Sequence, residues 1–268
     1  MYKKAYGIIE TLAPLHVGAT AGEESGNLNL IFRDQFTQTG IVPGSSLRGR
    51  FRAEMRRFDD EQEVNYWYGA GADSEESNIN NESIVKFEHA SIVWLPVFCP
   101  GQPVVWVTSP RLLRRYQRIT GIKAEEPDIY TASSNIKARE SNGKKTLFFN
   151  LGFLTINKVK NLSEWFPSKK ELPAVVVDDS DIAMIHDMAL YRQSRVRLKN
   201  DQKVVDGGGF FNTEALPEGT ILVFPIALRD DKQGKKWEPF AGNENTDIYL
   251  GGLESIGFGH CKLNIVNN

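Results

Sequence analysis

The chain has 268 residues, 41% of them hydrophobic and 25% charged, a composition typical of a globular protein with a core of ordinary size. Its formal net charge of −2 argues against a polybasic nucleic-acid binder, yet arginines cluster at 48–57, 111–118 and 192–197 and permit a basic groove. The 2 cysteines have no Cys-x-x-Cys neighbour, which argues against a disulfide framework or a zinc site. With no signal-like or long apolar segment, the chain is expected to be cytoplasmic, without membrane partners.

The N-terminal part predicts strands around one helix. Residues 4–17 alternate between apolar and polar and predict a strand, and LNLIF (28–32) predicts a second extended segment. A helix should follow VPGSS, with Ser45 or Ser46 as its N-cap. Its apolar stripe consists of Leu47, Phe51, Met55 and Phe58. An acidic stretch and a loop at 69–83 come next, followed by strands at 84–98 and 103–108 joined by CPGQ.

The next segment, 109–121, predicts a second helix, which Ser109 caps and Gly121 closes. Residues 122–145 are polar, and Asn142-Gly143 is a type I′ hairpin signal. The remaining elements are expected as a strand at 146–156, a polar insert, a helix near 180–191, a basic strand at 192–199, a glycine loop at 204–217, a strand at 219–228, and a strand–glycine loop–strand unit at 248–266.

This order of elements predicts an α+β fold with a ferredoxin-like core and polar insertions, rather than a doubly wound sheet. The sequence has neither an internal repeat of fixed period nor a clear domain boundary. We therefore expect a single domain over residues 1–268.

The first predicted helix carries candidates for phosphate contacts. Arg48, Arg52 and Arg56 are four residues apart on one face, beside Arg50. The turn at 43–46 offers backbone N–H groups and hydroxyls at a helix start, a natural place for phosphate. The alternative is a solvated helix face next to the acidic run 59–63.

The second helix has Arg111, Arg114, Arg115 and Arg118 opposite its apolar side chains. A solvated face is again the alternative, although an arginine-only cluster favours planar phosphate or carboxylate partners. Two glycine-rich stretches are further candidates. Gly207–Gly209 precede Phe210, which could stack on a base, and GGLESIGFG (251–259) has neither a Walker nor a Rossmann pattern. Tight turns are the alternative for both stretches.

The 4 histidines are dispersed and none has metal-ligand or triad spacing. His16 and His260 each adjoin a glycine loop, so either could act as a general base. The alternative is that both are packed or solvated residues.

Several segments together resemble one family. LHVG, TGIVPGSSLRGRFR, ASIVWLPVFCPGQPVVWVTSPRLLRRYQR and YLGGLESIGFGHCKL are similar to segments of the RAMP superfamily of CRISPR-associated proteins. Within it, the chain resembles the backbone subunit of Cmr-type, type III effector complexes, in the Cas seven family. The likeness covers most of residues 4–120 and about 190–266, and it is weak over about 121–185.

The resemblance implies an RNA-recognition-type, ferredoxin-like core in about 1–120 and 190–268, with a β-hairpin thumb in the insertion 121–185. It also implies head-to-tail stacking along CRISPR guide RNA, and partners that include target RNA and other effector subunits. The hairpin signal favours 122–150 over 70–84 for the thumb. The expected RNA-binding residues are His16, Gly18, Ser45, Ser46, Arg48, Arg50, Arg52, Arg114, Arg115, Gly208, Gly209, Phe210, Gly252, Gly257 and Gly259.

Members of this family can cut target RNA with an aspartate in the loop after the LHVG-like strand and a divalent metal. Counting back from Arg33-Asp34 places Leu28 at that position, and leucine can neither take a proton nor hold a metal. Glu23 and Glu24 could substitute under another register, and Glu214 matches a family acid near the cleavage site. RNA binding itself is expected to need no cofactor, and Mg²⁺ is expected only if cleavage is retained.

The leading hypothesis is therefore an RNA-binding backbone subunit that has lost target cleavage. An active metal-dependent endoribonuclease that uses Glu23 or Glu24 is the second. A guide-processing nuclease with His16 as general base is the third, and a cofactor enzyme unrelated to nucleic acids is the last alternative.

Overall fold

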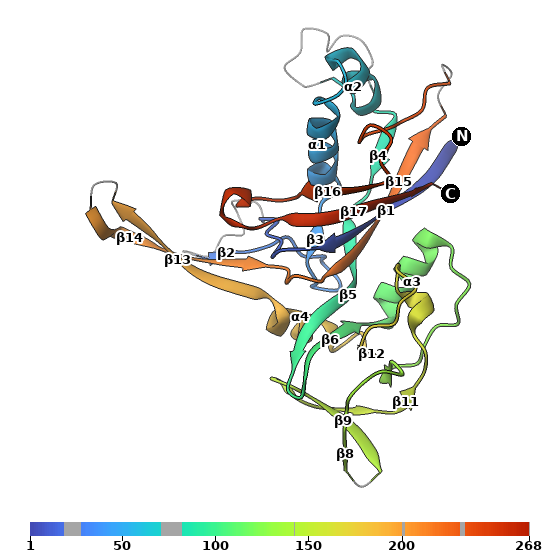
Figure 1. Ribbon diagram of the computed structural model, residues 1–268, viewed down its shortest axis with the longest axis vertical. Coiled ribbons are helices and arrows are strands. Elements are labelled where there is room, and N and C mark those ends of the chain that lie inside the picture. Colours follow the sequence, from blue (N-terminus) through green and yellow to red (C-terminus); the bar gives the residue numbers. More distant parts are fainter. Residues whose placement is uncertain (19–27, 71–81, 142, 200–201, 231–233, 268) are drawn as a thin grey trace.

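The computed structural model describes residues 1–18, 28–70, 82–141, 143–199, 202–230 and 234–267, with the backbone alone at 141, 197–199 and 202–210. The protein is a mixed α/β structure built on an 11-stranded sheet (Figure 1). Along its main path the strand order is β11-β7-β12-β6-β5-β15-β1-β17-β16, while β3 pairs with β5 and β4 with β15. None of the helices described is long and apolar enough to cross a membrane.

The strands of this sheet come from the whole sequence. They are β1 (Tyr2–Thr11), β3 (Ile41–Val42), β4 (Val85–Phe87), β5 (Ala90–Cys99), β6 (Gln102–Thr108), β7 (Thr131–Ala132), β11 (Lys158–Val159), β12 (Ala174–Val176), β15 (Ile221–Arg229), β16 (Asn245–Tyr249) and β17 (His260–Asn267). Strand β1 lies between β15 and β17 and pairs antiparallel with both. The first strand is thus held by two strands from the end of the sequence.

Alternating side chains of the strands support a core on each face of the sheet, as the period of two requires. Ile9, Phe224 and Leu95 belong to one core cluster, with the buried side of helix α1 (Gly44–Met55). Their neighbours Ile8, Val223 and Trp94 belong to the other cluster, with Leu113 and Tyr116 of helix α3 (Pro110–Thr120). The arginines of α1 and α3 therefore lie against different faces of the sheet.

Helix α1 has the predicted apolar stripe, since Leu47, Phe51 and Met55 are buried. Phe58 lies beyond the helix and is 61% exposed. The expected serine cap is wrong: Pro43 is the N-cap residue, and Ser45 and Ser46 lie in the first turn.

A second helix, α2 (Glu61–Tyr68), lies in the stretch that the sequence analysis took for a connection. The Asp60 side chain caps it by accepting a hydrogen bond from the backbone N–H of Glu63. The loop predicted at 69–83 lies mostly outside the described residues.

The predicted extent of α3 is confirmed, with Gly121 as a left-handed C-cap at φ 74°. Ser109 occupies the N-cap position, but its side chain makes no capping hydrogen bond. Helix α4 (Ile182–Ala189) also lies where it was expected. The expected single strand at 146–156 is two strands, β9 (Lys144–Phe149) and β10 (Gly152–Ile156), which form a three-stranded sheet with β8 (Arg139–Ser141). The turn joining β8 and β9 contains Gly143 at φ 72°, while Asn142 is outside the described residues.

The predicted glycine loop at 204–217 is wrong. Strand β14 (Gln202–Ala215) runs through it and pairs with β13 (Tyr191–Lys199), and the short β2 (Leu28–Asn29) joins β14 on its other side. The glycines still disturb the ladder, because Val196 pairs with Phe210 and Leu198 with Val205, so the chain between them forms a bulge. The β13–β14 hairpin extends far from the body of the protein (Figure 1).

Candidate nucleic-acid interface

His16 follows the end of β1 and is held by two other segments of the chain. It is only 8% exposed, and its Nδ1 atom lies 2.6 Å from the backbone oxygen of Glu214. Because a carbonyl oxygen only accepts hydrogen bonds, Nδ1 carries a proton, and in the neutral ring Nε2 is the acceptor. The backbone N–H of Gly252 donates to the backbone oxygen of His16 at 2.9 Å.

Two glycines shape the surroundings of this ring. A Cβ atom at Gly18 would lie 3.2 Å from Nε2 of His16, so glycine leaves that nitrogen uncovered. Gly251 has φ +78°, and a Cβ there would lie 2.1 Å from the backbone oxygen of His16. Only glycine therefore allows the C-terminal glycine loop to approach His16 this closely.

Glu214 also anchors an ionic cluster at the base of the long hairpin. Its side chain is 3% exposed, with Oε2 3.0 Å from Nη2 of Arg33 and Oε1 3.1 Å from Nη2 of Arg192. Both guanidinium groups also reach Asp187 Oδ1, Arg33 at 3.2 Å and Arg192 at 2.9 Å. Two cations and two anions thus compensate each other where α4, β13, β14 and the segment after β2 meet.

The network shifts the pKa values of its members. Burial raises the pKa of Asp187, but hydrogen bonds from Arg192 and Arg33 outweigh it and leave this pKa below its ordinary value. Burial likewise opposes the charge on Arg192, and its bonds to Asp187 and Glu214 raise its pKa nonetheless. Next to Asp187, burial lowers the pKa of His186 to about 3, and Nε2 of this neutral ring accepts the backbone N–H of Gly40 at 2.9 Å.

The expected RNA-binding arginines of α1 have partners within the protein. Arg48 donates to the backbone oxygen of Tyr68, and Arg52 donates to Asn65 at 2.6 Å, so both join α1 to α2. Arg50 pairs with Glu54 and also lies 3.5 Å from Glu254. Ser45 and Ser46, in the first helical turn, are exposed and partly exposed.

The contact between Arg50 and Glu254 connects α1 to the C-terminal glycine loop. Glu254 begins the short helix η3 (Glu254–Ile256), which Gly257 ends at φ 93°. Gly259, at φ +82°, packs against the Leu250 carbonyl and donates its N–H to the backbone oxygen of Pro14 at 2.8 Å. The segments 14–18, 44–50 and 250–259, all expected at RNA, thus lie side by side.

The position expected to hold a catalytic aspartate lies beside this cluster. Leu28 pairs with Asn212 and Asn29 with Thr213, in register next to Glu214. The side-chain oxygens described here do not suit Mg²⁺ as ligands, because both carboxylate oxygens of Glu214 bind arginines. Throughout the described part of the chain, no three His, Cys, Asp or Glu side chains converge as a metal site. Glu23 and Glu24 lie outside the described residues.

A family model of the RAMP superfamily matches residues 8–262 of this chain. The chain belongs to the RAMP superfamily. This confirms the family expected from the LHVG, PGSSLRG and glycine-loop segments.

Known RAMP proteins similar to this one include Cmr4. The CRISPR system CMR subunit Cmr4 of Saccharolobus solfataricus is 26% identical over 96 residues, which are 36% of this chain and 31% of that protein. The match thus spans about a third of the curated relative's length.

Solved structures share the fold along almost the whole chain. A chain of the type III-B Cmr-beta complex bound to cognate target RNA has a TM-score of 0.73 and 21% identity, covering 98% of this chain and 96% of that one. Oligomeric Cmr4 from Pyrococcus furiosus has a TM-score of 0.69 and 19% identity, covering 100% and 99%.

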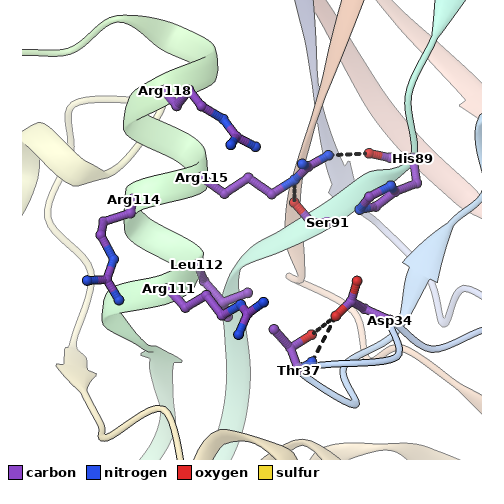
Figure 2. A pocket seen from close by; sticks show the side chains of 9 residues that line it. All are labelled: Asp34, Thr37, His89, Ser91, Arg111, Leu112, Arg114, Arg115 and Arg118. Atoms are coloured by element: carbon purple, nitrogen blue, oxygen red, sulfur yellow. Dashed lines mark hydrogen bonds between the residues drawn. The ribbon is translucent and has the colours of Figure 1, made fainter.

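The remaining candidates of this RAMP protein lie elsewhere. Arg114 and Arg115 are on α3, beside a pocket on the other face of the sheet (Figure 2). Gly208, Gly209 and Phe210 belong to β14, where Phe210 pairs with Val196. The structure therefore brings together His16, Gly18, Gly252 and Glu214, but not the arginines of α3.

The sequence analysis missed the partners of Glu214. Arg33 served only to align a motif, Asp187 was part of a helix, and Arg192 was one of several basic residues in a strand. One signal could have indicated these partners. Glu214 directly precedes the apolar Ala215 and Leu216, which suggests that its carboxylate is buried, and a buried carboxylate requires cations nearby.

Proposed function

We propose that this RAMP protein is an RNA-binding backbone subunit of a type III CRISPR interference complex, which polymerises along guide RNA and holds the guide–target duplex. The observation that carries the proposal is the meeting of segment 250–259 with 14–18, through hydrogen bonds to His16 and Pro14, and with 44–50, through Arg50 and Glu254. Nε2 of His16 can accept a hydrogen bond, and the turn before α1 offers backbone N–H groups to a phosphate.

The strand order supports a ferredoxin-like core. Strands β17, β1, β15 and β5 are neighbours in that order and each adjacent pair is antiparallel. In chain order these are the fourth, first, third and second of the four, and α1 lies between β1 and β5. We place the core in 1–120 and 190–268 of a single domain, and the thumb in 121–185, which contains β8 and β9.

The proposed partners are guide RNA, target RNA, other copies of this chain and other effector subunits. The similar Cmr-beta chain comes from a complex bound to target RNA, and the similar Pyrococcus furiosus Cmr4 was crystallised as an oligomer. Copies related head to tail form an open filament when their rotation does not close a ring.

We also propose that target cleavage is lost. Leu28 offers no carboxylate, and Glu214 is committed to Arg33 and Arg192. An assembled complex supplied with Mg²⁺ should leave bound target RNA intact. Cleavage at regular intervals, abolished by alanine at Glu23 and Glu24, would support the endoribonuclease alternative, and cutting of free repeat RNA would support a guide-processing nuclease.

The binding proposal is tested with guide RNA and the purified chain at a series of salt concentrations. Arg48→Glu should weaken binding and lower the salt slope, since a phosphate contact becomes a repulsion. Because Arg48 also holds Tyr68 of α2, thermal unfolding of the variant must be measured in parallel. An unchanged salt slope in a folded variant would contradict a phosphate contact at Arg48.

A further inference from the structure

A pocket of about 390 Å³ lies between α3 and the turn at residues 34–37 (Figure 2). Its lining residues are Asp34, Thr37, His89, Ser91, Arg111, Leu112, Arg114, Arg115 and Arg118. His16 is not among these lining residues, although Asp34 directly follows Arg33 of the Glu214 ionic cluster. Four arginines on one wall are far more than a solvated surface requires.

Two of these arginines are neutralised within the protein. Arg114 lies 3.4 Å from Asp179, and Arg115 lies 3.4 Å from Glu88 while donating to Ser91 at 2.8 Å. Arg111 and Arg118 make no ion pair with any residue in the described ranges. The Asp179 side chain accepts a hydrogen bond from the backbone N–H of Arg111 at 2.9 Å and so caps the start of α3. This contact uses the backbone of Arg111 and leaves its guanidinium group available.

The wall of the pocket that faces α3 has a fixed negative charge (Figure 2). Oδ1 of Asp34 accepts from the N–H groups of Phe36 and Thr37 and from the Thr37 hydroxyl. Burial raises the pKa of Asp34, yet these bonds hold it below its ordinary value. An anion entering the pocket is therefore attracted by the arginines of α3 and repelled by Asp34 on the facing wall (Figure 2).

An aromatic side chain lies at the edge of this positive region. Phe36 is 74% exposed, and the Arg111 guanidinium lies 5.4 Å from its ring centroid. Exposure of the Phe36 ring to water costs free energy. Proteins hold single-stranded nucleic acid by stacking its bases on aromatic rings that lie beside cationic side chains. A base can stack on the ring while its phosphate lies between the arginines.

We propose that this pocket binds single-stranded RNA, with a backbone phosphate between Arg111 and Arg118 and a base stacked on Phe36. The inference rests on the RNA-binding function proposed above and adds a second contact on the opposite face of the sheet. Phe36 favours RNA over an acidic peptide, because Asp and Glu side chains have no aromatic ring to stack on it.

The test compares three variants of the full chain: Arg111→Gln/Arg118→Gln, Phe36→Leu, and Lys170→Gln as a control of matched chemistry at an exposed site away from the pocket. The probes are a short polyuridylate and inorganic tripolyphosphate. The double variant should bind both probes about tenfold more weakly, with an RNA salt slope lower by about one. Phe36→Leu should weaken RNA by about fivefold and leave tripolyphosphate unchanged, because only RNA has bases to stack. Lys170→Gln should change neither.

A second measurement locates the RNA. Polyuridylate containing 4-thiouridine should crosslink to the peptide that contains Phe36, and the double variant should lose this crosslink. If wild-type protein binds RNA without that crosslink, or the double variant binds as wild type does, the pocket assignment is wrong while the proposed function stands. If wild-type protein binds no RNA, both are wrong. Binding of a polyglutamate peptide that RNA does not displace would reassign the pocket to an acidic partner.

Discussion

Nη2 of Arg33 lies 3.0 Å from Oε2 of Glu214, although 181 residues separate them in the sequence. This contact fixes the segment after β2 to the base of the long hairpin. The backbone oxygen of Glu214 also accepts a hydrogen bond from Nδ1 of His16. One residue therefore positions both the ionic cluster and the histidine of the candidate interface.

Replacing Glu214 with glutamine should destabilise the fold. The change removes a buried charge and leaves two guanidinium groups with less compensation, at a cost of about 2 kcal/mol in free energy of unfolding. Chemical denaturation followed by circular dichroism measures it. Asp187→Asn is the control: Asp187 is 52% exposed, so it should lose less than about 1 kcal/mol. Equal losses would contradict the role assigned to burial.

Gly18→Ala should weaken RNA binding without unfolding the protein. The added methyl group would lie 3.2 Å from Nε2 of His16 and cover the acceptor. Loss of one hydrogen bond predicts about 1 kcal/mol, or roughly fivefold in affinity. His16→Gln should have a similar effect, and combining the two should add little, since both remove the same contact. Additive losses in filter binding would show that Nε2 is not the atom concerned.

Stability should fall as pH falls from 7 to 5 because of His186. Its pKa of about 3 in the folded protein is below the ordinary value near 6.5. The unfolded chain therefore takes up a proton in this range and the folded chain does not, so the stabilisation is complete above about pH 6.5 and is lost toward pH 3. We expect a loss of about 2 kcal/mol between pH 7 and 5.

A variant of His186 identifies the titrating group. His186→Gln should be less stable at pH 7, because the Gly40 N–H loses its acceptor, and should show a flatter dependence on pH. A slope that persists unchanged in His186→Gln would refute the assignment.

Leu28→Asp tests whether the missing carboxylate explains the proposed loss of cleavage. Leu28 is partly exposed on β2, next to β14, so an aspartate there need not be buried. In an assembled complex with Mg²⁺, the variant should cut target RNA where the wild type does not, and Leu28→Asn should remain inactive because an amide cannot act as a base. Gel electrophoresis of end-labelled target RNA provides the measurement.

Much of the fold was predictable because its signals are local. The apolar stripe of α1 and the Gly121 C-cap of α3 are short-range patterns. The short α2 was hidden by its charges, since only Val64, Trp67 and Tyr68 are buried. The three glycines from Gly207 on indicated a loop, but they form a bulge within β14, which pairs with β13 on both sides of them.

The candidate site was only partly predictable. His16 and the C-terminal glycines were found because glycine beside a functional residue type is visible in the sequence. The compensation of arginine charges could not be seen, because Arg33 and Glu214 meet only through the sheet. For the same reason, the sequence alone could not separate the paired Arg114 and Arg115 from Arg111 and Arg118.

The position of β1 between β15 and β17 has a consequence for synthesis of the protein. The strand leaves the ribosome early, but its hydrogen-bonding partners at 221–229 and 260–267 are made more than 200 residues later. His16, which follows this strand, also waits for later parts of the chain, because backbone groups of Glu214 and Gly252 hold it in place. A nascent chain therefore cannot complete the contacts that hold His16 until Gly252 has left the ribosome.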